Sequence, residues 1–79
     1  RYPSAARRDG VEGVAVVRVY LDAKGAVTDV AIVTSTGDPR LDDAALAEVK
    51  ARWRFTPRYE DGAPVASTVK ARLEFRLNR

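Results

Sequence analysis

Residues 65–77 read VASTVKARLEFRL, and the alternation in this stretch decides the fold. Successive side chains of a β-strand point to opposite faces of the sheet. Six apolar residues and Ser67 would share one face, and the other face would carry four charged residues with Ala66 and Thr68. The pattern predicts an amphipathic strand over residues 65–77, with one face buried and one face in water.

Two further strands are predicted at residues 14–21 and 27–34, because both stretches are rich in β-branched residues. Between them, Asp22-Ala23-Lys24-Gly25 is typical of a turn in which glycine takes a positive φ, so a hairpin is expected. One face of the first strand holds Ala15, Val17, Val19 and Leu21, and the other holds Val14, Val16, Arg18 and Tyr20. The second face is interpreted as half-covered sheet, although three of its residues, Val14, Val16 and Tyr20, would also suit contact with a second chain.

Two helices are predicted from their end signals. Residues 2–10 carry Pro3 in a first turn and end in Gly10, which suits the position just past a helix. Residues 39–52 follow Asp38, a capping residue, and begin with a proline. The apolar stripe of this second helix is Leu41, Ala45, Leu46, Val49 and Trp53.

The second helix is expected to end in Trp53-Arg54-Phe55-Thr56-Pro57, because a residue before proline avoids the helical conformation. Trp53 and Phe55 are interpreted as core residues rather than as a recognition platform. Residues 58–64, which contain Asp61-Gly62, are predicted to be a loop.

The order helix, strand, strand, helix, strand predicts an α+β fold in one domain of 79 residues. A right-handed crossover through the second helix places the third strand antiparallel beside the first. The sheet is therefore expected to be three-stranded and antiparallel, in the order second, first, third, with both helices on one face. The last strand would form an open edge.

The composition argues against an enzyme or a metal protein. The chain contains no Cys and no His, which removes thiol chemistry and the usual general base near neutral pH. The adjacent acids Asp42-Asp43 and Glu60-Asp61 are explained by charges at a helix start and in a loop. No catalytic residue, cofactor or metal site is predicted, and no run of about 18 apolar residues indicates a membrane span.

The basic residues are concentrated after residue 49, although the net charge of the chain is only +3. A nucleic-acid partner is not favoured, because the outward face of the last strand offers no aromatic residue for base stacking. Lys70, Arg72 and Arg76 are instead interpreted as charges that protect an open edge from random pairing. Such an edge still accepts a chosen strand, the mode known as β-augmentation.

Short motifs follow one another along the whole chain: Tyr2-Pro3, Glu12-Gly13, the turn ending in Gly25, Ser35-Thr36-Gly37, Leu41-Asp42 with Ala44-Ala45-Leu46, Trp53-Arg54-Phe55-Thr56-Pro57, Gly62-Ala63-Pro64-Val65 and Phe75-Arg76-Leu77. Their order and spacing closely resemble the C-terminal domain of the TonB family. The most specific are Tyr-Pro at the start and Trp-Arg-Phe-x-Pro before the last strand.

The resemblance implies that residues 1–79 form a single periplasmic domain of a longer energy transducer, anchored in the inner membrane of a Gram-negative bacterium. In that family the domain binds the TonB box of outer-membrane transporters as an added strand. The proton gradient, acting through ExbB and ExbD, then drives active transport such as siderophore uptake. A TolA-like module that serves envelope integrity is the alternative, and both a monomer and a strand-exchanged homodimer stay open.

The resemblance also assigns roles to residues. The peptide-binding edge strand would be Val69, Lys70, Ala71, Arg72, Leu73, Glu74, Phe75, Arg76, Leu77 and Asn78. The motif scaffold would be Tyr2, Pro3, Gly13, Gly25, Leu41, Trp53, Phe55 and Pro57. Better-known members of the family also use residues just before Tyr-Pro in peptide contacts, so part of the site is expected upstream of Tyr2.

Overall fold

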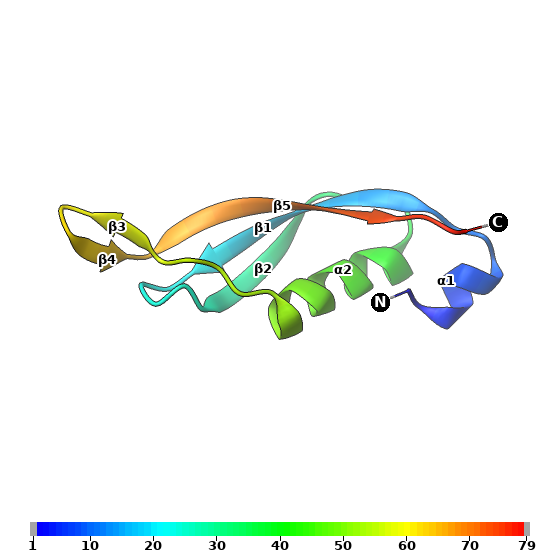
Figure 1. Ribbon diagram of the computed structural model, residues 1–79. Coiled ribbons are helices and arrows are strands. Elements are labelled where there is room, and N and C mark those ends of the chain that lie inside the picture. The colour runs from blue at the N-terminus through cyan, green and yellow to red at the C-terminus, as the bar shows by residue number, and fades with distance from the viewer. Residues whose placement is uncertain (1, 79) are drawn as a thin grey trace.

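The computed structural model describes residues 2–78 as a narrow molecule of 49 × 19 × 18 Å (Figure 1). Its elements in chain order are α1 (Ser4–Arg8), β1 (Gly13–Leu21), β2 (Val27–Thr34), α2 (Pro39–Arg52), β3 (Arg58–Glu60), β4 (Ala63–Val65) and β5 (Ser67–Phe75). The main sheet has the order β2-β1-β5, and both pairings are antiparallel. The predicted α+β fold and strand order are confirmed.

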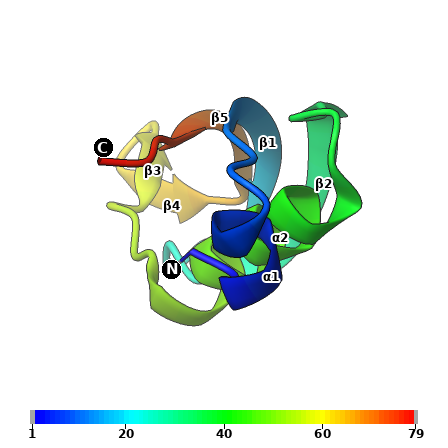
Figure 2. The ribbon, with the colours of Figure 1, turned by 90° about the vertical axis from the view of Figure 1, so that its right-hand side faces the viewer.

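Both helices lie on the same face of this sheet, and α1 sits beyond the end of α2 (Figure 2). The buried residues of β1 alternate as the sequence predicts: Ala15, Val17, Val19 and Leu21. From α2, Leu41, Ala45 and Val49 complete the core, while Leu46 and Trp53 pack against it half-buried. Removing a side chain such as Leu41 from water contributes about 1.5–3 kcal/mol.

Residues 58–64 are not the predicted loop, because they contain most of a small hairpin. Asp61 and Gly62 both have positive φ values, 53° and 81°, and β3 pairs with β4 around them. Two such residues match the twist of an antiparallel pair, which favours a two-residue hairpin turn. The hairpin takes Val65 as the partner of Arg58.

The last strand is shorter than predicted, since it covers Ser67–Phe75 instead of residues 65–77. At its start, Val65 belongs to the small hairpin. At its end, Phe75 already pairs with Gly13, the first residue of β1, so no partner remains for the residues that follow. The alternation within the strand is confirmed, because its charged residues are exposed while Ala71 and Phe75 are buried.

Helix α1 is also shorter than predicted and covers only Ser4–Arg8. Pro3 caps its start in an extended conformation, and Gly10 follows its end with φ 70°. Nearby packing holds this short helix. The Tyr2 hydroxyl donates a hydrogen bond to the Val11 carbonyl, and the Tyr2 ring meets Phe75 edge to face at 5.5 Å.

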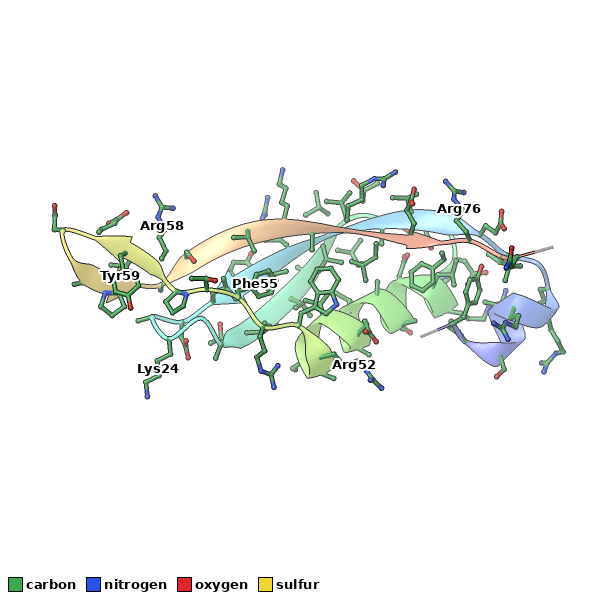
Figure 3. The ribbon with its side chains drawn as sticks, in the orientation of Figure 1. Lys24, Arg52, Phe55, Arg58, Tyr59 and Arg76 are labelled. Carbon is green, nitrogen blue, oxygen red and sulfur yellow. The ribbon has the colours of Figure 1, made fainter. Side chains whose placement is uncertain are left out.

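The segment after α2 crosses the end of the β1–β2 hairpin. In Figure 3, Phe55 turns toward the sheet, whereas Lys24 and Arg52 point away from it. Gly25, in the hairpin turn, has φ 85°, and a Cβ atom there would lie 2.3 Å from the Phe55 carbonyl oxygen. The scaffold prediction for Gly25 therefore has two physical reasons, its backbone conformation and this close approach.

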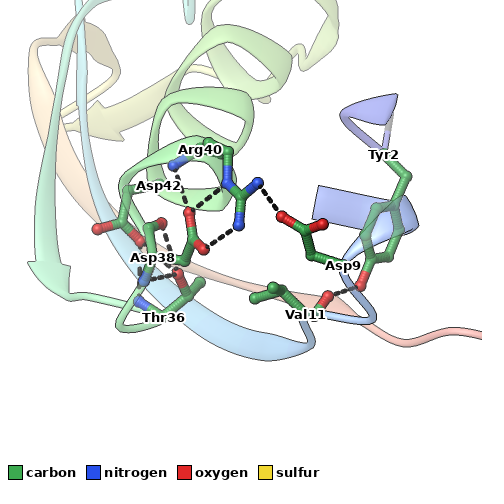
Figure 4. A network of polar contacts seen from close by, with 7 residues as sticks. All are labelled: Tyr2, Asp9, Val11, Thr36, Asp38, Arg40 and Asp42. Carbon is green, nitrogen blue, oxygen red and sulfur yellow. Dashed lines mark hydrogen bonds and ion pairs between the residues drawn. The ribbon is translucent and has the colours of Figure 1, made fainter. Parts of the chain in front are cut away.

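A polar network fixes the loop that leads into α2 (Figure 4). The Asp38 carboxylate accepts a hydrogen bond from the Arg40 backbone N–H at 2.8 Å, which confirms the predicted cap. The Arg40 guanidinium contacts Asp38 at 2.7 Å and Asp9 at 2.8 Å, so it joins α2 to the end of α1. The Asp42 carboxylate accepts hydrogen bonds from the Ser35 hydroxyl and from the backbone and side chain of Thr36.

These contacts shift the pKa values of Asp38, Arg40 and Asp42. Partial burial alone raises the pKa of Asp42, but the hydrogen bonds from Ser35 and Thr36 outweigh it and hold that pKa below its usual value. The side chain and backbone of Arg40 lower the pKa of Asp38. The pKa of Arg40 is raised in turn, chiefly by its hydrogen bonds to Asp38 and Asp9.

We expect Gly25→Ala to destabilise the domain more than Gly62→Ala. Both glycines have a left-handed φ, which costs an alanine about 1–2 kcal/mol, but a Cβ at Gly62 meets nothing within 4 Å. The contact with the Phe55 carbonyl should add about 1–3 kcal/mol to the cost at Gly25. Urea unfolding followed by the fluorescence of Trp53 measures both variants. If the two variants lost equal free energy of unfolding, the close contact at Gly25 would cost nothing, because residues 53–57 would move aside freely.

We also expect the loop before α2 to weaken in acid. Because the folded pKa of Asp42 is depressed, its contribution is present above the unfolded pKa of about 3.9 and is lost as the pH falls through the folded value. Asp42→Asn should lower the free energy of unfolding at pH 7 by about 1–2 kcal/mol and flatten its decline below pH ~4. Asp43→Asn, at an exposed neighbouring position, is the control. If both substitutions lowered the free energy of unfolding equally, the stabilising role assigned to the Asp42 hydrogen bonds would be wrong.

Candidate functional site

One edge of β5 is free along its whole length. Within residues 2–78, β1 is the only strand that pairs with β5, through nine residue pairs from Gly13↔Phe75 to Leu21↔Ser67. The N–H and C=O groups on the other side of an edge strand lack a ladder partner. This edge can therefore accept the backbone of another chain without any change in the existing sheet.

The structure places the predicted peptide-binding residues in two different environments. Residues 69–75 lie in β5, whereas residues 76–78 continue past the end of the strand. There the Leu77 backbone N–H donates a hydrogen bond to the Glu12 carboxylate at 2.7 Å. Arg76, Leu77 and Asn78 also line a hollow of about 600 Å³ together with Arg7 and Arg8 of α1. The regular edge available for pairing is thus Ser67–Phe75.

A groove of about 410 Å³ is lined by residues of β5 and α2 beside the free edge. Tyr2, Trp53, Leu73 and Phe75 provide its apolar and aromatic lining. Four charged residues border it as well: Glu48 from α2, Arg72 and Glu74 from β5, and Arg76 just after β5. The groove can receive apolar side chains that lie on the helix side of the edge.

Sequence reasoning missed the groove, although it named Tyr2 and Trp53 as scaffold and residues 72–76 as edge strand, which leaves Glu48 as the lining residue that it did not name. Glu48 was not identified, because its sequence context is an ordinary helix position with an i,i+4 ion pair to Arg52 at 3.3 Å. The packing of α2 under the sheet brings Glu48 beside the last strand. No local pattern in residues 45–52 reveals that neighbour.

The predicted scaffold residues are spread around this region. Leu41 is fully buried, and a Cβ on Gly13 would lie 2.9 Å from the Thr36 side chain. The Trp53 and Phe55 rings lie 6.1 Å apart and pack half-buried against the core. Trp53 also lines the groove, so it serves both the core and the candidate site.

Glu74 partly compensates the positive charges near the end of β5. Arg72 lies 3.1 Å from Glu74, and Arg76 lies 3.7 Å from the same carboxylate. These exposed pairs contribute little stability. Figure 3 shows Arg76 projecting away from α2, on the outer side of the sheet. The charges leave the backbone edge itself uncovered.

Other site types find no support in the part of the chain that the structure describes. No group of three or more potential metal ligands occurs among residues 2–78. No described helix is long and apolar enough to cross a membrane. The free edge of β5 with its groove is therefore the candidate site.

The model for the family described as "Gram-negative bacterial TonB protein C-terminal" matches residues 1–77. Protein TonB of Vibrio cholerae is 38% identical over 77 residues, which are 98% of this chain and 31% of that protein. Protein TonB of Xanthomonas campestris is 36% identical over 78 residues, 99% of this chain and 34% of its own length. The chain thus spans about a third of the length of these relatives.

Solved structures agree with these relatives. The TonB C-terminal domain of Helicobacter pylori superimposes with a TM-score of 0.79 at 30% identity, covering all of this chain and 70% of that one. The TonB C-terminal domain of Pseudomonas aeruginosa gives a TM-score of 0.75 at 28% identity, covering all of this chain and 79% of that one. The chain therefore belongs to the family of Gram-negative TonB C-terminal domains.

Proposed function

We propose that this chain is the periplasmic, partner-binding domain of a TonB-type energy transducer. It binds the TonB box of outer-membrane transporters by adding that peptide as a strand along the free edge of β5. The observation that carries the proposal is the unpaired edge of Ser67–Phe75 next to an apolar groove. Membership of the TonB family supports this choice of partner.

The dimensions of the edge suit one short extended peptide. Nine residues of strand span roughly 30 Å, at about 3.3 Å for each residue. Pairing with an edge of this length uses backbone groups, which every peptide sequence offers. One domain can therefore bind several transporters whose TonB boxes differ in side chains.

The surroundings of the edge add a preference for an amphipathic peptide. Alternate side chains of an added strand would point to the helix side, over the groove lined by Trp53 and Leu73. The remaining side chains would point outward beside Lys70 and Arg72, which are exposed. Apolar residues on one side and polar or acidic residues on the other fit these two environments.

Strand addition also suits a domain that transmits force. The hydrogen bonds of an antiparallel ladder lie perpendicular to the strands, so a pull along the strand direction loads many bonds together. In the proposed protein, ExbB and ExbD act on segments outside this chain, and an inner-membrane anchor and periplasmic spacer carry the force to the domain. The proton gradient would then drive uptake, including that of siderophores.

N-methylated peptides test the strand pairing without altering the protein. In a peptide carrying a TonB box, methylation of alternate amides removes the donors on one side of the strand only. The set that faces β5 should weaken binding at least about tenfold, because each lost hydrogen bond costs about 0.5–1.5 kcal/mol, while the complementary set should change little. The single Trp53 in the groove reports binding by fluorescence, and backbone amide signals of β5 report its place.

Equal effects of the two methylated sets would contradict strand pairing, as would amide shifts confined to β2, the opposite edge of the sheet. Light scattering without peptide shows whether a second copy of the chain pairs with the same edge. In that case added peptide should dissociate the dimer, since both compete for one set of backbone groups.

A further inference from the structure

The face of the main sheet that lies opposite the helices, here called the outer face, is uncovered in both views (Figures 1 and 2). β1 contributes Val14, Val16, Arg18 and Tyr20 to it, and β5 contributes Thr68, Lys70, Arg72 and Glu74. β2 adds Asp29 and Ala31, which pair with Tyr20 and Arg18. This face is distinct from the free edge of β5 and does not depend on its proposed function.

Two cations meet at the centre of the outer face. Arg18 lies directly opposite Lys70 in the β1–β5 ladder, and opposed residues of an antiparallel pair have Cβ atoms about 5 Å apart. Neither side chain forms an ion pair or hydrogen bond with any residue in the 2–78 range. The neighbouring Arg72, by contrast, has Glu74 at 3.1 Å. Like charges in direct opposition destabilise a sheet.

Edge protection explains only part of this arrangement. Charges on an edge strand deter random pairing, which accounts for Lys70 and Arg72 on β5. Arg18 lies on β1, the central strand, where both edges are already paired. Arg18 is half-buried, with Lys70 on one side and the small Ala31 on the other. A polar uncharged residue at this position would avoid the repulsion from Lys70. The charge of Arg18 therefore has no evident role in the isolated domain.

We propose that the outer face binds a short acidic segment of a polypeptide, with carboxylates placed at Arg18 and Lys70. The charge pattern sets the length of that segment. Asp29 and Glu74 lie at opposite ends of the face, beside Tyr20 and Val14. Glu74 is ion-paired with Arg72 at 3.1 Å and with Arg76 at 3.7 Å, so its end of the face is not negative. Asp29, at the other end, would repel a membrane surface or a nucleic acid that carried negative charge across the whole face. A segment with an acidic centre and basic or neutral ends complements this pattern, and Val16 and Tyr20 offer it apolar contact.

Two synthetic peptides of identical composition probe the pattern. Ac-KVDADVK-NH₂ has an acidic centre and basic ends, whereas Ac-DVKAKVD-NH₂ has the reverse. The first should bind at least about threefold more tightly and shift the amide signals around Arg18 and Lys70. Arg18→Gln and Lys70→Gln should each weaken this binding by about three- to tenfold. Lys24→Gln makes the same charge change in the β1–β2 turn, away from the outer face, and should leave binding unchanged.

The free domain provides an independent readout. Arg18→Gln should raise the melting temperature, because it removes the repulsion, and Lys24→Gln should not. The proposal is overturned if the two peptides bind equally, if Lys24→Gln weakens binding as much as Arg18→Gln, or if Arg18→Gln lowers stability. It is also overturned if phosphatidylglycerol vesicles or oligothymidylate bind more tightly than the first peptide and depend on Arg18. Binding of the TonB box to the β5 edge is tested by the two N-methylated peptide sets, so each proposal fails separately.

Discussion

The pairing of β1 with β5 is the interaction on which the rest of the structure depends. It joins residues 13–21 to residues 67–75 through nine pairs, and it places the buried Ala71 and Phe75 beside the inward face of the central strand. The connection between them is long, but the entropic cost of closing a loop rises only slowly with its length. The elements within the connection offset that cost, because α2 buries Leu41, Ala45 and Val49 in the core and β2 packs half-buried apolar residues against it.

The register of this ladder fixes what each face of the sheet can do. A slip by one residue would turn Ala71 and Phe75 outward and bury Lys70 or Arg72, so one register is strongly preferred. The same register ends β5 at Phe75, opposite Gly13, and so limits the regular edge to nine residues. It also brings Arg18 opposite Lys70. The core, the free edge and the cationic centre of the outer face thus follow from one alignment of two strands.

The sequence predicts the features that depend only on residues close together in the chain. The alternation in residues 67–75, the cap at Asp38 and the stripe of α2 each depend on neighbours within a few residues, and the structure confirms all three. The β3–β4 hairpin was missed although Asp61-Gly62 is a strong turn signal, because the residues flanking it are mostly exposed and show no apolar face.

The groove illustrates what a single segment cannot reveal. Its lining residues come from distant parts of the chain: Tyr2 from the start, Glu48 from the middle and Leu73 from the end. The local sequence explains each of them without a groove, as a scaffold residue, a helix-surface residue and a strand residue respectively. Only the packing of α2 and the N-terminal segment against the edge of the sheet brings them together. The pairing of Arg18 with Lys70 is of the same kind, because register rather than composition creates the repulsion.

The site proposed at the edge and the site proposed on the outer face would use different chemistry, and strand addition would connect them. An added strand lies in the plane of the sheet, so it would turn β5 from an edge strand into an internal one. Lys70 and Arg72 would then no longer lie at the margin, where water solvates them from the side, and their repulsion with Arg18 would grow as that solvent is excluded. Acidic side chains on the outward positions of the added strand would offset this cost. The cations on β5 therefore protect the edge from uncharged strands and, by the same electrostatics, favour an acidic one.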